Sequence, residues 1–229
     1  MLSTIYVTLW VVLSAVVMIL MAKMTNIRAT KATPDDEFEE IHKCVQPYEF
    51  NTKAIMFFIL IIILSGIAAC FASIDSVSTI AYIKLGICYL AVLGAAVIDI
   101  KLHIIPNFIP LGLIIARILI FIYELIFTDK AISYIISSLI GCFLCCLILL
   151  IADKVSKGGI GKGDIKLLAS IGFMCGLYAA FFTLLLALLF CIIIAVVLLL
   201  AKRKKSKDHL PFGPFIYLGY ISMILLTLY

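Results

Sequence analysis

The sequence predicts an all-α fold, a polytopic bundle of membrane helices, from its composition and from the length of its apolar runs. Of 229 residues, 65% are hydrophobic and 14% charged, and the mean hydropathy is +1.26, well outside the range of soluble domains. Many runs reach the roughly 20 residues that cross a hydrocarbon core of about 30 Å. Little sequence remains for a separate soluble domain.

Eight apolar runs separated by short polar breaks are the expected membrane spans. They comprise residues 4–22, 54–73, 79–98, 108–127, 132–151, 165–178, 180–201 and 212–228. The division between the sixth and seventh spans is the least certain, because Gly172, Gly176 and Leu177-Tyr178 are all candidates for the turn, and one tilted helix is the alternative. The first run has no basic segment before it, which favours a retained span over a cleaved signal.

We expect two parts along the chain. Residues 1–53 would contain the first helix and a mixed-charge cytosolic loop, and residues 54–229 would form the membrane-embedded domain with the candidate site.

The Lys and Arg residues predict the orientation, because basic loops stay in the cytosol. With the N-terminus outside, all but three of the 18 Lys and Arg fall in cytosolic segments. The exceptions, Lys84, Arg117 and Lys130, lie inside or near the outer ends of spans, where long side chains can snorkel. The basic run at 202–207 follows a span directly, so topology and anionic lipid explain it better than nucleic acid. We expect a multi-pass protein of the cell membrane.

Two aspartates are the candidate functional residues, because ionisable groups at membrane depth are costly. Asp99 ends an apolar run at the predicted cytosolic interface, shortly before Pro106, which should break the helix. Asp164 follows a glycine-rich segment at 157–163 and opens the next helix. Two carboxylates that share a proton can activate water and protonate a scissile carbonyl. The alternative is that both merely lie at helix ends in water.

The surroundings of the two aspartates also predict different roles. Asp164 adjoins a helix N-terminus and has Lys162 and Lys166 nearby, which should favour its ionised form. Asp164 would then be the base and Asp99 the acid, although cytosolic topology alone also predicts these lysines.

Three ordered strings resemble the motifs of type IV prepilin leader peptidases, which are GxGD aspartyl membrane proteases. They are Asp99 with the later Ile105-Pro106-Asn107, then Gly161-Lys162-Gly163-Asp164-Ile165-Lys166-Leu167-Leu168, and finally Pro211-Phe212-Gly213-Pro214-Phe215. The resemblance extends from about Leu90 onward. It implies an endopeptidase that removes the short basic leader from prepilins or pseudopilins at the cytosolic face, with Asp99 and Asp164 as the catalytic pair. The resemblance also implies substrate binding or motif support by Pro106, Asn107, Gly161, Lys162, Gly163, Lys166, Pro211, Phe212, Gly213 and Pro214.

The resemblance has one departure, which concerns methylation. Many bacterial members also methylate the new N-terminus and have two CxxC pairs in the first cytosolic loop, whereas this loop contains only Cys44. We therefore expect no zinc site, no cofactor for proteolysis, and S-adenosylmethionine only if methylation is retained. The pattern Cys142-x-x-Cys145-Cys146 lies in an apolar run and indicates core packing.

The expected partners are prepilin-type substrates and membrane lipid but no nucleic acid, and the oligomeric state stays open. A proton-coupled transporter or channel is a second hypothesis for the aspartates, although no inverted repeat is evident. A presenilin-like or signal-peptide-peptidase-like protease is a third, but the Pro-Ala-Leu motif and Tyr-Asp pair of that group are missing.

Three further patterns have structural interpretations. His103 lies four residues after Asp99 and is expected to be a solvated interfacial histidine. Arg117 and Glu124 share a helix face, which indicates pairing or snorkelling. Gly172-x-x-x-Gly176 is expected to let two helices approach closely.

Overall fold

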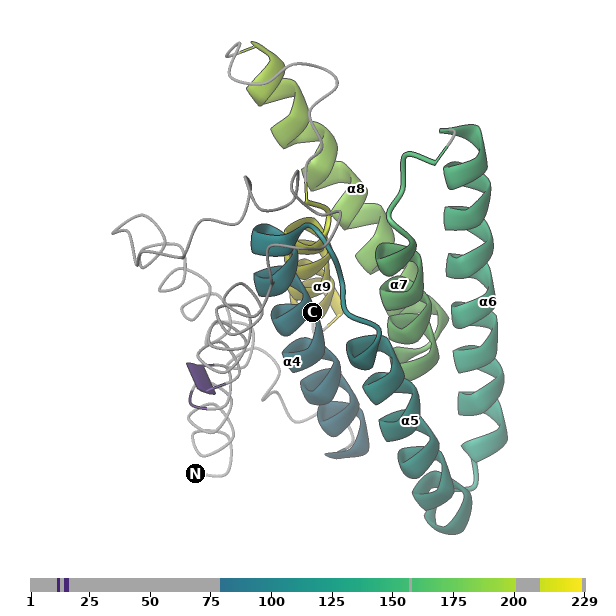
Figure 1. Cartoon of the computed structure of the whole chain (residues 1–229). Coiled ribbons are helices and arrows are strands. Elements are labelled where there is room, and N and C mark those ends of the chain that lie inside the picture. Colours follow the sequence, from purple (N-terminus) through teal and green to yellow (C-terminus); the bar gives the residue numbers. More distant parts are fainter. Residues whose placement is uncertain (1–11, 13–14, 17–78, 157, 201–210, 228–229) are drawn as a thin grey trace, which may run out of the picture.

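The computed structural model describes residue 12 and residues 15–16, 79–156, 158–200 and 211–227. Every regular element in these ranges is an α-helix (Figure 1). In chain order they are α4 (Thr79–Leu102), α5 (Phe108–Phe127), α6 (Ala131–Val155), α7 (Lys162–Cys175), α8 (Leu177–Leu200) and α9 (Gly213–Thr227). The all-helical class is thereby confirmed. The expected spans at 4–22 and 54–73 lie largely or wholly outside the described residues, so the number of eight stays a prediction.

Four of these helices are long and apolar enough to cross a membrane, namely α4, α5, α6 and α8, and α9 is a shorter apolar helix. The sixth expected span, 165–178, does not appear at full length. It corresponds to α7, which has 14 residues and therefore rises only about 21 Å. That length is less than the hydrocarbon core of about 30 Å.

A sharp break at Gly176 separates α7 from α8, as the sequence predicted. Gly176 has a φ of 90°, a left-handed value that glycine adopts without a steric penalty. Its N–H donates to the carbonyl of Gly172 at 2.9 Å. The one-helix alternative for this stretch is therefore excluded.

The small residues near this break bring α7 against α6. A Cβ on Gly172 would lie 2.6 Å from the backbone carbonyl of Gly141 in α6, and one on Gly141 would lie 2.8 Å from the backbone of Gly176. The predicted role of Gly172 and Gly176 in close helix packing is confirmed.

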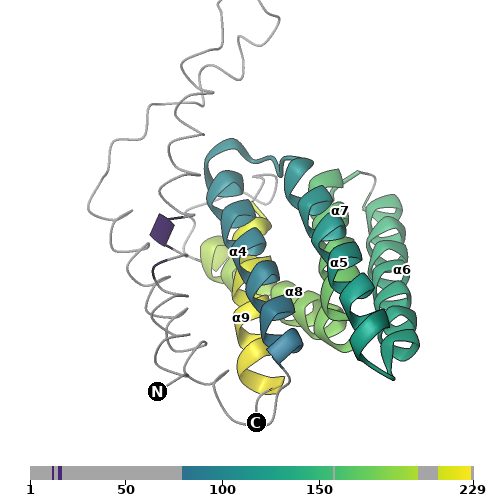
Figure 2. The same ribbon diagram turned by 90° about the horizontal axis from the view of Figure 1, so that it is seen from below.

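The core lies around α4 and α7. Residues 92–99 of α4 are all buried, as is most of α7. Figures 1 and 2 show α9 beside α4, and α7 between α5 and α6. Large apolar side chains on α5, α6 and α8 are exposed, as expected of surfaces that face lipid. The end of α4 and the start of α7 are thus held in the interior, where Asp99 and Asp164 occur.

Candidate active site

Asp99 lies near the end of α4 and meets the start of α9. Its side chain is 5% exposed, and its Oδ2 accepts a hydrogen bond of 2.7 Å from the backbone N–H of Gly213. Gly213 is the first residue of α9. A helix N-terminus presents unpaired N–H groups and a positive partial charge, both of which favour a carboxylate.

The chain leaves α4 through a left-handed residue. His103 has a φ of 50°, and its N–H donates to the carbonyl of Asp99 at 3.0 Å, which is a common way to end a helix. The break predicted before Pro106 is confirmed, since α4 ends at Leu102 and α5 begins at Phe108. The His103 side chain is exposed, as expected.

Asp164 lies in the first turn of α7 and is 9% exposed. Its Oδ1 is buried and has no hydrogen-bond partner among the described residues. Its Oδ2 lies over Gly161, where a Cβ would approach it to 2.7 Å. The first glycine of the motif therefore leaves room for the carboxylate, whose Oδ1 is buried without a partner among the described residues.

Burial and, after it, the negative charge of Asp99 together raise the pKa of Asp164 to about 7. Asp164 lies outside the four spanning helices. The side chains of Lys162 and Lys166, which the sequence interpretation used to favour an ionised Asp164, are both exposed. Loss of hydration thus opposes the ionised form that the sequence interpretation expected for Asp164, and the division of acid and base roles stays a prediction. The influence of Asp99 shows that the two carboxylates are electrostatically coupled.

The loop after α4 packs directly on the start of α7. A Cβ on Gly163 would lie 2.9 Å from the Ile105 side chain and 3.3 Å from its backbone oxygen. The Nζ of Lys166 donates to Oδ1 of Asn107 at 2.9 Å. The second motif glycine thus allows close approach, and the first two motif strings contact one another.

The third string closes the site from α9. A Cβ on Gly213 would lie 2.8 Å from the Cβ of Asp99 and 2.9 Å from its Oδ2. The Phe212 carbonyl accepts hydrogen bonds from the N–H groups of Phe215 and Ile216. Pro211 and Pro214 are both half-buried beside this helix start. All three strings therefore meet at one end of the bundle, although Lys162 faces outward.

Two side chains that the sequence interpretation missed, those of Asp153 and Ser156, shape the loop before Asp164. Oδ1 of Asp153 accepts the Ile160 N–H at 3.1 Å, and the Ser156 hydroxyl accepts the Gly159 N–H at 3.2 Å. An Asp and a Ser just before a glycine-rich loop are typical of side chains that bind nearby backbone N–H groups. That pattern could have indicated their structural role.

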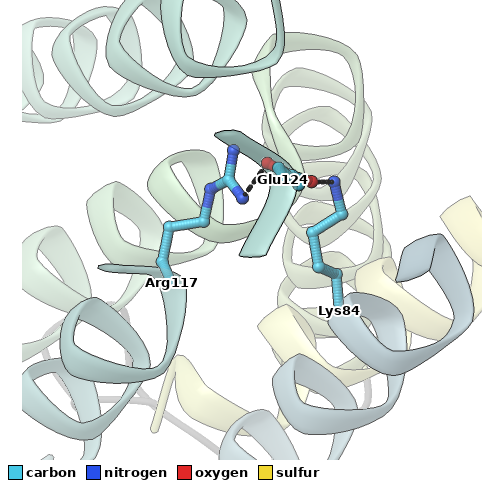
Figure 3. Close-up of polar contacts among 3 residues, drawn as sticks. All are labelled: Lys84, Arg117 and Glu124. Carbon is cyan, nitrogen blue, oxygen red and sulfur yellow. Dashed lines mark hydrogen bonds and ion pairs between the residues drawn. The ribbon is translucent and has the colours of Figure 1, made fainter. Parts of the chain in front are cut away.

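Lys84, Arg117 and Glu124 form an ion-pair cluster (Figure 3). The cluster lies toward the end of α4 that is away from Asp99. Glu124 accepts Arg117 at 2.7 Å and Lys84 at 2.8 Å, and Lys84 also lies 5.0 Å from the centre of the Tyr134 ring in α6. Arg117 and Glu124 are 0% and 1% exposed. Pairing of Arg117 with Glu124 is confirmed, whereas snorkelling is wrong for Arg117. The sequence interpretation missed Lys84 as a partner of Glu124, because Lys84 lies on another helix.

Metal ligands were expected to be absent, and the structure bears on only part of that question. Cys142, Cys145 and Cys146 are free thiols along α6. In the described ranges no three His, Cys, Asp or Glu side chains are grouped to hold a metal ion. Cys44 and its loop lie outside the described residues.

Fold and site together define a class of protein: a membrane helix bundle with a buried, coupled pair of carboxylates. The model of the Type IV leader peptidase family matches residues 85–196, a segment that contains both aspartates. The matched segment resembles this family and contains the first two strings, whereas the third string, at 211–215, lies outside the match.

A curated relative supports the same assignment. The chain is 36% identical over 133 residues to the prepilin leader peptidase/N-methyltransferase of Bacillus subtilis (strain 168), an alignment that covers 55% of this chain and 48% of the relative. The chain thus spans about half the length of the relative it matches. No solved structure matches significantly.

Proposed function

We propose that this chain is a membrane aspartyl endopeptidase that removes the short basic leader from prepilins or pseudopilins. The observation that carries the proposal is the pair of buried carboxylates, Asp99 and Asp164, of which one raises the pKa of the other. Their place within a segment of the Type IV leader peptidase family supports the substrate class.

The proposed chemistry uses the two aspartates in unlike protonation states. Asp99 accepts the Gly213 N–H and is the ionised member, which takes a proton from the attacking water. Asp164, with its pKa raised to about 7, holds the shared proton and donates it to the scissile carbonyl from its free Oδ1. When the tetrahedral intermediate collapses, Asp99 passes the proton it took from water to the leaving amine, and a hydroxyl of the intermediate returns a proton to Asp164 as the peptide bond breaks.

The location of the reaction follows from the substrate. A basic leader stays in the cytosol, and the apolar helix that follows it enters the bilayer. The scissile bond therefore lies at the inner interface of the cell membrane. The charge asymmetry of the loops supports placing the aspartate end of the bundle there, with the N-terminus outside.

The proposed proteolysis needs no cofactor, because water and two carboxylates supply the nucleophile, the base and the acid. Methylation is a separate matter, and we propose only the peptidase step. S-adenosylmethionine enters only if the chain also methylates the new N-terminus, which labelled S-adenosylmethionine added to the cleavage assay would detect.

The test is cleavage of a purified prepilin-type substrate by the protein in liposomes. Asp99→Asn and Asp164→Asn should each lower the rate by at least about 1,000-fold, because the pair acts as a unit. Asp129→Asn is the matched control, since Asp129 is exposed in the turn between α5 and α6 and should retain the full rate. Wild-type activity in either dyad variant would contradict the proposal.

A further inference from the structure

Among the described residues, the backbone N–H of Gly213 is the one hydrogen-bond donor to the side chain of Asp99. The bond is 2.7 Å long and joins residues that are 114 positions apart. Since Asp99 is 5% exposed, water cannot readily replace this donor. A carboxylate that accepts an N–H bond in a buried site is stabilised in its ionised form.

Gly213 also lies too close to Asp99 to tolerate a side chain. A Cβ at this position would lie 2.8 Å from the Cβ of Asp99 and 2.9 Å from its Oδ2. The absence of a side chain lets the N–H approach the carboxylate. The sequence placed Gly213 in the third string, with substrate binding or motif support as its expected role.

The other groups that act on Asp99 do not supply a second donor. His103 at the end of α4 acts on Asp99 through its charge, and Asp164 on α7 is the second carboxyl of the pair. No charged side chain occurs in α9. Arg117 and Glu124, the charged residues of α5, are paired with each other.

We propose that the backbone N–H of Gly213 is a positioning group that holds Asp99 in place and in its ionised form. This rests on the proposed function, because it explains why Asp99 rather than Asp164 acts as the base. The start of α9 thereby becomes part of the active site through its contact with Asp99.

An amide-to-ester replacement at residue 213 tests this most directly, because it removes the N–H and adds no side chain. We expect kcat for prepilin cleavage to fall about 10- to 100-fold with little change in KM, the size of a lost bond to a charged group. Asp99 should also bind its proton more tightly, so the acid limb of the pH–rate profile should move up by about one pH unit. An unchanged kcat and acid limb would overturn the proposal.

Gly213→Ala and Gly219→Ala form a matched pair that separates positioning from packing. A Cβ on Gly219, in the same helix, would lie 2.6 Å from the Thr183 carbonyl oxygen in α8, away from Asp99. Both variants should unfold at lower temperature, but only Gly213→Ala should shift the acid limb. Equal pH profiles for the two variants would show that Gly213 matters only for packing, which would overturn the proposal.

Infrared titration of the carboxyl C=O band provides a readout that does not depend on activity. The Asp99 band is assigned by its loss in Asp99→Asn, and in the ester variant it should appear at higher pH than in the wild type. If no prepilin is cleaved but this shift occurs, the positioning role stands and the proposed substrate fails. If cleavage occurs and the band does not move, the positioning role fails alone.

Discussion

At the residue scale, the feature that matters most is the unlike environment of the two aspartates. Asp99 receives a hydrogen bond from Gly213, whereas Oδ1 of Asp164 is buried with no partner in the described part of the chain. Both lie in the interior, and they are coupled by charge. Such an asymmetric pair can divide the roles of acid and base.

The raised pKa of Asp164 predicts how stability depends on pH. A native pKa of about 7, against an ordinary value of 3.8, means that the folded state binds the proton more tightly than the unfolded state. The free energy of unfolding should therefore fall as pH rises from about 4 to about 7, and then level off. The full effect is on the order of 4 kcal/mol.

Asp164→Asn should abolish the fall in the free energy of unfolding between pH 4 and pH 7. The variant should therefore unfold at a higher temperature than the wild type at pH 8 and at a similar temperature at pH 4. Thermal unfolding in detergent micelles at both pH values measures the difference. Asp129→Asn, which alters an exposed carboxylate, should follow the wild type. A wild-type stability that rises steadily between pH 4 and pH 7 would contradict the assignment.

At the element scale, glycines decide how closely the helices meet. Gly141 and Gly172 place the backbones of α6 and α7 in direct contact, and Gly161 and Gly163 let the start of α7 accommodate Asp164 and Ile105. A backbone cannot move aside as a flexible side chain can. The close packing at these glycines therefore helps to determine where Asp164 lies.

Gly172→Ala should destabilise the protein by about 1–3 kcal/mol, because the new Cβ would lie 2.6 Å from the Gly141 backbone. This cost should exceed the gain in helix propensity of up to about 1 kcal/mol. Gly112→Ala is the matched control, since Gly112 lies in α5 with nothing within 4 Å of an added Cβ. Thermal unfolding should show a lower melting temperature for Gly172→Ala and no decrease for Gly112→Ala. Equal melting temperatures would contradict the close contact between α6 and α7.

At the scale of the whole molecule, the two ends of the bundle have separate tasks. Lys84 and Asp99 are 15 residues apart on α4, a rise of about 22 Å along the helix. The aspartate end contains the candidate chemistry, and the other end contains the ion pairs that join α4 to α5. Stability and activity should therefore be separable by mutation.

Glu124→Gln should lower the free energy of unfolding by about 3–5 kcal/mol, because it leaves the buried Arg117 without its counter-charge. Lys84→Met should cost less, since Lys84 is 15% exposed and its removal leaves Arg117 and Glu124 paired. Melting temperatures of the purified variants measure the order. Below their melting temperatures both variants should cleave substrate at near the wild-type rate, and a selective loss of kcat in Glu124→Gln would contradict the separation of the two ends.

The sequence alone determined the features that depend on neighbours along the chain. Hydropathy and run length predicted the helices from residue 79 onward, Pro106 and Gly176 predicted the breaks, and helical periodicity put Arg117 and Glu124 on one face. The motif spacing singled out Asp99 and Asp164. Each of these inferences needs only local geometry and composition.

Tertiary structure alone decided which groups from different helices meet. It gave Asp99 its donor on α9, Glu124 its second cation on α4 and Lys166 its partner Asn107. It also raised the pKa of Asp164, against the expectation from the sequence, because the burial that causes the shift arises from packing. Hydration and long-range contacts depend on how the helices assemble, which no periodicity within a single helix encodes.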